Sequence, residues 1–284
     1  MADELTTYAS VTPRGNPRIP ASAVDQRVVV LARAFEKQFE TRVFCIIHPS
    51  EGQEQLDCFS ERLHEEVLDQ LQTVERRKAI AILLDSPGGD LRSAFRIAKT
   101  IKRHCSEYYV FIPRLAASAA TVLALGASRL YFGEHAEIGP IDPQVSVPDH
   151  ARRVSSLEVV HSLTRINSEA LQIMESTLTL LSQRSGKRPE SLISEAIKYT
   201  SDFVRPIVEK IDSVSFTFHS RLLKTAEAYA YTLLVGGGMD EDSAKNISAK
   251  LTRGYHDHAF VIDCGEAQRI GLDVLSSNRS PHPI

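Results

Sequence analysis

The first half of the chain alternates between two hydrophobic periodicities. Residues 42–48 and 79–85 are short, nearly continuous apolar runs, which is typical of strands buried within a sheet. Residues 61–74 and 91–102 instead carry their apolar side chains at spacings of three and four, so both ranges are predicted to be amphipathic helices. Residues 108–113 form the next apolar run and therefore the next predicted strand.

Shorter elements continue this alternation. Residues 117–127 are small and apolar and predict a helix that closes at Gly126, and residues 129–133 predict another strand. Residues 136–144 are expected to form one further extended piece. A β-α-β-α-β order over residues 42–144 favours a largely parallel sheet with helices on its faces, which is the α/β fold class.

The pattern changes near Ser155, and it predicts a helical second half. Helices are expected over residues 155–184, 190–199, 212–235 and 240–251, followed by a short extended piece and a last helix. Three parts follow from this: a flexible arm over residues 1–24, an α/β core over 25–150, and a helical region over 151–284. The core opens with a charged helix over residues 25–41. We expect the helical region to pack on the core and to mediate assembly.

Composition narrows the function class. The 284 residues carry a net charge of −3, which is no footprint for a polyanion, so nucleic acid is not an expected partner. The four cysteines lack CxxC spacing, which argues against a zinc ribbon or a disulfide scaffold and favours a reducing compartment. No apolar run approaches the length of a membrane span, and the N-terminus lacks the pattern of a signal peptide. We therefore expect a cytoplasmic protein.

The stretch "SPGGD", residues 86–90, follows the apolar run that ends at Asp85. Its glycine pair, Gly88 and Gly89, lets the backbone turn sharply and leaves N–H groups uncovered by side chains. Such amides at the start of a helix can stabilise an oxyanion. An ordinary strand-to-helix turn with Asp90 near the N-cap explains the same residues equally well.

The stretch "AASAA", residues 116–120, sets one serine between a predicted strand and a predicted helix. Small neighbours permit the tight turn of a nucleophile elbow, with Ser118 at the positive end of the helix dipole. The amide of Ala119 would then be available to an oxyanion. The alternative is that Ser118 is simply the N-cap of the helix, a common role for serine.

Together, "SPGGD", "AASAA" and the later "EIGPIDPQ" resemble the Clp-protease/crotonase superfamily. Within it the chain is most similar to the serine dehydrogenase proteinase family, relatives of signal peptide peptidase A. The resemblance implies a β-α-β superhelical core with a mostly helical C-terminal half, and a homo-oligomer. It implies Ser118 as nucleophile and an oxyanion hole at Gly88, Gly89 and Ala119.

At the position expected for the general base, this sequence differs from the family's better-known members. The Clp proteolytic subunit has "IH" where this chain has Ile141 and Asp142, and no lysine occurs between Ser118 and Lys187. Asp142 could orient another group or take a proton itself, or it could be a structural carboxylate that caps the turn before Pro143. The other candidates for the base are the side chains of His135, His161, Lys187 and His258, and Lys198 is a weaker one.

Three functions remain compatible with the sequence. The first is a serine peptidase that acts on peptides or proteins through an acyl-enzyme on Ser118. The second is a catalytically silent oligomeric scaffold of the same fold, and the third is a crotonase-type enzyme of acyl-CoA. We expect no cofactor and no metal: His256 and His258 lack a completing ligand set, and no phosphate-binding glycine loop is present.

Overall fold

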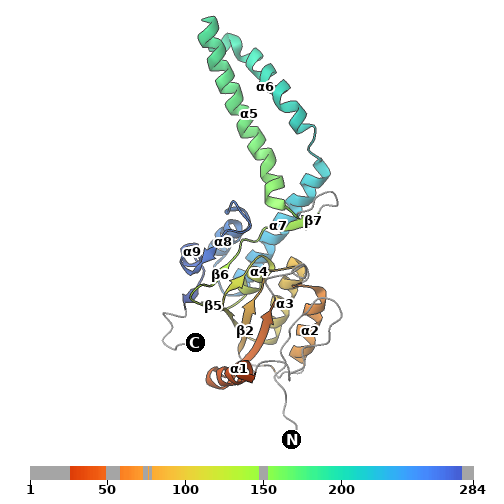
Figure 1. Cartoon of the computed structure of the whole chain (residues 1–284), viewed down its shortest axis with the longest axis vertical. Coiled ribbons are helices and arrows are strands. Elements are labelled where there is room, and N and C mark those ends of the chain that lie inside the picture. Colours follow the sequence, from red (N-terminus) through yellow and green to blue (C-terminus); the bar gives the residue numbers. More distant parts are fainter. Residues whose placement is uncertain (1–25, 49–57, 73–75, 77–78, 147–152, 277–284) are drawn as a thin grey trace. The chain divides into compact units, whose positions relative to one another are not determined.

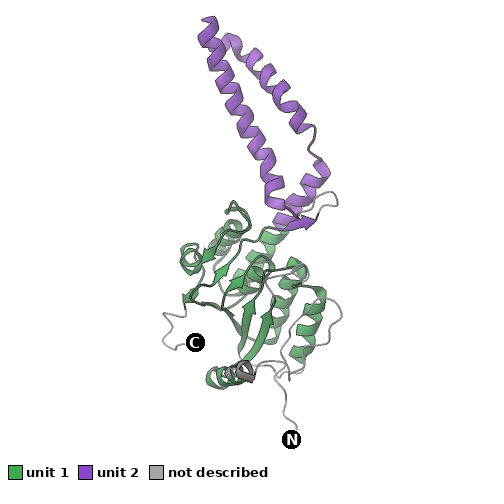
Figure 2. Cartoon of the chain, viewed as in Figure 1, with its two compact units in different colours: residues 1–142, 225–284 green, residues 143–224 purple. Residues whose placement is uncertain are grey.

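The computed structural model describes residues 26–48, 58–72, 76, 79–146 and 153–276. The chain divides into two compact units: unit 1 comprises residues 1–142 and 225–284, and unit 2 comprises residues 143–224 (Figure 2). The arm expected over residues 1–24 lies outside the described residues. The expected domain ranges and their role in assembly stay predictions.

A five-stranded parallel sheet forms the centre of unit 1 (Figure 1). Every pair of neighbouring strands in it is parallel, in the order β1-β2-β3-β5-β10, so the prediction of an α/β fold with a parallel sheet is confirmed. The last strand comes from the far end of the chain and pairs with β5. The strands are β1 (Arg42–Ile47), β2 (Ala79–Asp85), β3 (Glu107–Ile112), β5 (Arg129–Phe132) and β10 (Val274–Ser276).

Apolar side chains on both faces of this sheet are buried. In β1, Phe44 and Ile46 join the main core, while Val43 and Cys45 pack with Ala32 of the first helix. This two-sided burial explains why β1 and β2 appear in the sequence as nearly continuous apolar runs. The helices of unit 1 are α1 (Gln26–Phe39), α2 (Glu61–Gln72), α3 (Leu91–His104), α4 (Ala119–Leu125), α8 (Glu241–Arg253) and α9 (Cys264–Arg269), together with the second half of α7 (Ser213–Gly236).

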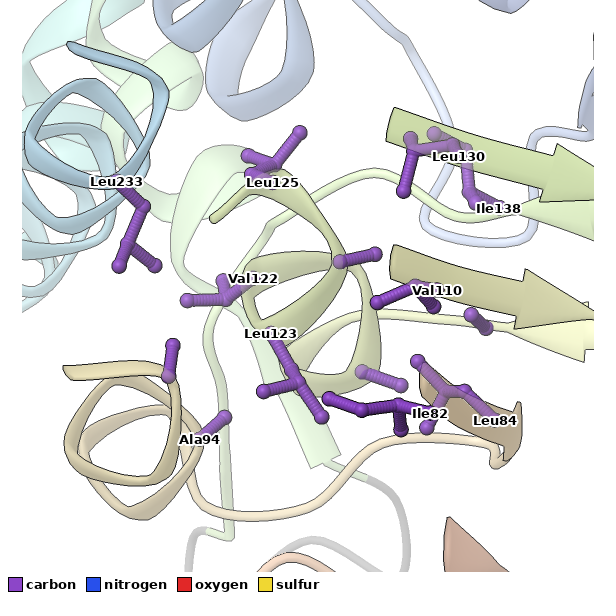
Figure 3. Close-up of a cluster of buried hydrophobic side chains, with 14 of the residues drawn as sticks. Ile82, Leu84, Ala94, Val110, Val122, Leu123, Leu125, Leu130, Ile138 and Leu233 are labelled. Atoms are coloured by element: carbon purple, nitrogen blue, oxygen red, sulfur yellow. The ribbon is translucent and has the colours of Figure 1, made fainter. Parts of the chain in front are cut away.

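Helix α4 lies at the centre of the main core, and all seven of its residues are buried. Figure 3 shows Val122 and Leu123 of this helix among Ala94 of α3, Ile82 of β2 and Leu233 of α7. The small residues of α4 are what allow a helix to pack so closely against its neighbours on all sides. The N-terminus of α4 is therefore held in a fixed position, and Ser118 directly precedes it.

Three short strands form a second sheet beside the first, in the order β4-β6-β9. They are β4 (Leu115–Ala116), β6 (Glu137–Ile138) and β9 (Ile262–Asp263). The extended piece expected over residues 136–144 includes β6. The sequence pattern did not predict β4, because two residues are too few to show a period.

Unit 2 contains a pair of helices joined by a tight turn: α5 (Ser156–Ser185) packs along α6 (Ile193–Val208), with a short 3₁₀ turn, η3 (Pro189–Leu192), between them. Gly186 ends α5 in a left-handed conformation, as helix C-termini commonly do. Helix α6 extends well past the predicted end at Tyr199, because Phe203 and Ile207 continue its apolar spacing. The strands β7 (Gln144–Ser146) and β8 (Arg153–Ser155) pair antiparallel in this unit.

Candidate active site

Ser118 stands on a strained turn between β4 and α4. Its backbone has φ 53° and ψ −113°. Among the non-glycine residues that the structure describes, only Glu40 shares a positive φ. Such a conformation costs on the order of 1–3 kcal/mol and persists only where its surroundings impose it. A strained residue between a strand and a helix is the local geometry that a nucleophile elbow requires.

Hydrogen bonds on both sides of Ser118 impose this conformation. The Ser86 N–H donates to the Leu115 carbonyl at 2.8 Å, and the Ala117 N–H donates to the Ser86 carbonyl at 3.0 Å, so β4 is tied to the end of β2. The Thr121 hydroxyl lies 2.7 Å from the Ala116 carbonyl oxygen and 2.8 Å from that of Gly139. The chain is thus fixed before and after the serine.

The Ser118 side chain does not cap the helix that it precedes. It occupies the N-cap position of α4 but makes no capping hydrogen bond, and the described part of the chain offers no other partner to its hydroxyl. Ser155 provides the contrast within the same chain, because its Oγ accepts the Glu158 N–H at 3.0 Å at the start of α5. Of the two interpretations of Ser118, the simple helix cap is the one that this geometry disfavours.

The glycine pair of "SPGGD" lies against Ser118. A Cβ added to Gly88 would lie 2.8 Å from the Ala117 carbonyl oxygen and 3.0 Å from the Ser118 Cβ. Gly88 and Gly89 have φ values of 116° and 139°, which only glycine adopts without strain. The two motifs that the sequence places thirty residues apart therefore meet in space.

Two backbone amides near the serine have no hydrogen-bond partner among the described residues. They belong to Gly89 and to Ala119, the first residue of α4. The Gly88 N–H is different, because it donates to the Ser86 Oγ at 3.2 Å. Gly88 therefore contributes space beside Ser118, while Gly89 and Ala119 keep amides available to an oxyanion.

Asp90 is the N-cap of α3, which is the ordinary structural role that its place in the sequence allows. Its carboxylate accepts the Ser93 N–H at 2.7 Å at the N-terminus of α3. This cap fixes the beginning of α3 directly after the glycine pair. The turn is thus a strand-to-helix connection and also a source of an exposed amide, so the two interpretations of "SPGGD" do not exclude each other.

The candidate bases lie in different surroundings. Asp142 is buried after β6, and His258 is half-buried, with its Nδ1 atom inaccessible to solvent. His135 is exposed in the turn before β6. In unit 2, His161 is exposed on α5, and Lys187 is exposed just past the end of that helix. Among the described residues none of these five side chains is hydrogen-bonded to Ser118, so the identity of the base stays a prediction.

Sequence analysis gave no role to His48 and Ser86, whose side chains are hydrogen-bonded to each other next to the glycine turn. Their side chains are buried, and the His48 Nδ1 lies 2.9 Å from the Ser86 Oγ. Burial lowers the pKa of His48 from its ordinary 6.5 to about 4, so the ring is neutral at physiological pH. A polar residue at the end of each of two adjacent parallel strands was the signal that could have revealed this pair.

The described residues contain no group of three or more histidine, cysteine or acidic side chains arranged to hold a metal ion. None of their helices is both long enough and apolar enough to cross a membrane.

Comparison with known proteins adds a family and two relatives. A model of the family described as ClpP-like SDH-type serine proteinase matches residues 16–183. Two proteins of Methanocaldococcus jannaschii, named Uncharacterized protein MJ0137 and Uncharacterized protein MJ1495, are 28% and 26% identical to the chain over 210 and 247 residues. The matches cover 74% and 85% of this chain but 58% and 69% of those proteins, so the chain spans less than two thirds of the first relative's length.

Among solved structures, the chain is similar to two mutants of the 1510-N membrane-bound stomatin-specific protease, one of them in complex with a substrate peptide. Each is 21% identical and has a TM-score of 0.32. The matches cover 49% of this chain and 61% and 64% of the two neighbours.

Proposed function

The chain belongs to the ClpP-like SDH-type serine proteinase family, and from this premise we propose that it is a serine peptidase with Ser118 as its nucleophile. The observation that carries the proposal is the Ser118 hydroxyl itself, which is free of a capping bond at the N-terminus of a buried helix. A serine that is held in a strained conformation and does not cap its helix is best explained by a catalytic role.

In the proposed reaction the Ser118 Oγ attacks the carbonyl carbon of a peptide bond. The amides of Gly89 and Ala119 stabilise the negative oxygen that forms, since neither is engaged within the described residues. The serine proton passes to a general base and then to the leaving amine, and water hydrolyses the resulting acyl-enzyme. The substrate class is peptides or proteins, in a cytoplasmic setting.

The base is proposed to be one of the five side chains named above, with Asp142 first because it is buried and follows the strand next to β4. Substitution of each residue in turn tests this assignment. Removal of the base should lower the rate of peptide cleavage at least a hundredfold in a variant that thermal unfolding shows to be folded. Removal of a bystander should leave the rate within about threefold of wild type.

Labelling with a fluorophosphonate probe tests the nucleophile. The wild-type protein should be labelled and Ser118→Ala should not. Ser155→Ala is the matched control, because Ser155 is an ordinary capping serine, and it should be labelled like the wild type. Labelling that persists in Ser118→Ala would show that another residue is the nucleophile.

A silent oligomeric scaffold is the second candidate function. A scaffold needs an assembly surface, and apolar side chains are exposed along α6, where Ile197, Tyr199 and Phe203 are each more than half exposed. We propose that unit 2 mediates homo-oligomer formation through this helix in either case. Light scattering should report a smaller species for Ile197→Glu with Phe203→Glu than for wild type. An assembled wild type that neither labels nor cleaves peptides would favour the scaffold.

A further inference from the structure

A buried pair of polar side chains joins the ends of two adjacent strands beneath the glycine turn. His48 directly follows β1 and Ser86 directly follows β2, and their side chains are 2.9 Å apart. Both residues are almost completely inaccessible to solvent, at 2% and 0% exposure. A buried polar group that lacks a hydrogen bond destabilises the fold, so the partners of this pair matter for how firmly it is held.

The hydrogens of this pair can be assigned from its partners. A hydrogen bond with the backbone of Cys58 raises the pKa of His48 against the larger effect of burial, as a carbonyl that accepts a ring N–H does. Since Nδ1 faces Ser86, the nitrogen left for Cys58 is Nε2. Nδ1 of the neutral ring is then an acceptor, so the Ser86 hydroxyl donates to it.

The Ser86 Oγ can also accept a hydrogen bond, and its donor lies in the glycine turn. The Gly88 N–H donates to the Ser86 Oγ at 3.2 Å. A directed chain therefore runs from the Gly88 amide through Ser86 and His48 to the Cys58 carbonyl. In this assignment the Ser86 hydroxyl both donates to His48 and accepts from Gly88, so one side chain links the histidine to the turn.

The segment that follows Cys58 holds the other side of the turn. The Phe59 N–H donates to the Gly88 carbonyl at 3.1 Å, and the Asp90 N–H donates to the Phe59 carbonyl at 2.7 Å. The backbone groups on both sides of the Gly89 amide are thus fixed, whereas that amide has no partner among the described residues. His48 touches both supports, since it contacts Ser86 and the segment that carries Phe59.

We propose that His48 is a positioning residue, which sets the direction of the Gly89 amide through Ser86 and through the Cys58–Phe59 segment. This role rests on the proposed function, because it takes Gly89 as an oxyanion donor. His48 does not touch the substrate and takes no part in proton transfer. A neutral imidazole suits the task because it donates on one side and accepts on the other.

The test compares the rate of fluorophosphonate labelling in four variants. His48→Phe and Ser86→Ala should lower the maximal rate of labelling about 10- to 100-fold while probe binding changes little, since a misdirected amide acts only on the developing negative charge. His48→Asn should recover much of this loss, because its Oδ1 can accept the Ser86 hydroxyl. His64→Phe is the matched control: His64 is also buried and bonded to a hydroxyl, that of Thr100, but it lies on α2.

A second measurement does not depend on activity. Hydrogen–deuterium exchange of the peptide that spans residues 84–91 should be faster in His48→Phe and Ser86→Ala than in wild type and in His64→Phe. Labelling of His48→Phe at the wild-type rate, or unchanged exchange in that peptide, would overturn the positioning role. Wild-type protein that is not labelled would instead overturn the proposed function, and the exchange measurement would still decide whether His48 holds the turn. If His48→Phe fails to fold, Ser86→Ala and His48→Asn decide both questions.

Discussion

Gly88 and Ser118 pack directly against each other, so closely that a methyl group on Gly88 would lie 3.0 Å from the Ser118 Cβ. Gly88 also has a φ of 116°, and its carbonyl and amide are both engaged in hydrogen bonds. The contact joins two turns that follow different strands. It is what brings the glycine pair and the serine together in space.

Gly88→Ala should therefore destabilise the protein by about 2–4 kcal/mol and abolish fluorophosphonate labelling, because backbone strain and a steric clash add together. Gly238→Ala is the matched control. Gly238 has a similar φ of 104°, but its added Cβ would meet nothing within 4 Å, so this variant should lose only about 1 kcal/mol. Thermal unfolding of both variants measures the difference. Equal losses would show that the contact with Ser118 is not tight.

Ser118→Gly should be more stable than Ser118→Ala by about 1 kcal/mol, because glycine adopts a φ of 53° without strain. Ser118→Ala itself should be nearly as stable as wild type, since no capping bond is lost. Ser155 differs, because its side chain caps α5: Ser155→Ala should lose about 1 kcal/mol of stability with this capping bond. The melting temperatures of the four proteins check this pattern, and a Ser118→Ala that loses as much as Ser155→Ala would contradict it.

The sequence predicted the elements that local patterns encode. The apolar runs became β1, β2 and β3, and the helix of small residues became α4 with Ser118 before it. The turn residues Gly88, Gly89 and Asp90 could be assigned because glycine freedom and capping are properties of a few neighbouring residues.

The structural features that the sequence did not predict depend on contacts with distant segments of the chain. Strand β4 exists because Ser86 and β6 pair with it, and β10 exists because it pairs with β5. Burial of His48 likewise depends on the Phe59 segment, which no periodicity connects to it. Long-range pairing of this kind leaves no local signature.

Thr121 links the turn at Ser118 to the segment after β6, so its loss should disturb the position of Ser118. Its hydroxyl contacts the carbonyl oxygens of Ala116 and Gly139, and its side chain is fully buried. Thr121→Val should cost about 1–3 kcal/mol, because the Gly139 carbonyl loses this donor, and should slow fluorophosphonate labelling. Thr121→Ser keeps the hydroxyl and should label at close to the wild-type rate. Equal labelling of the two variants would contradict a role for this link.

Stability should fall in acid because of His48. Burial lowers its pKa from 6.5 to about 4, so between these values the unfolded chain binds a proton that the folded chain does not. Its contribution to stability is therefore complete above pH 6.5, decreases as the pH falls through this interval, and is fully lost below pH 4, a change of about 3 kcal/mol. Urea unfolding at pH 7.5, 5.5 and 4 measures this change. His48→Asn has no titrating ring and serves as the control, since both proteins carry the same carboxylates. The prediction is wrong if wild type and His48→Asn lose stability in parallel over this range, because the buried ring would then contribute nothing to the pH dependence.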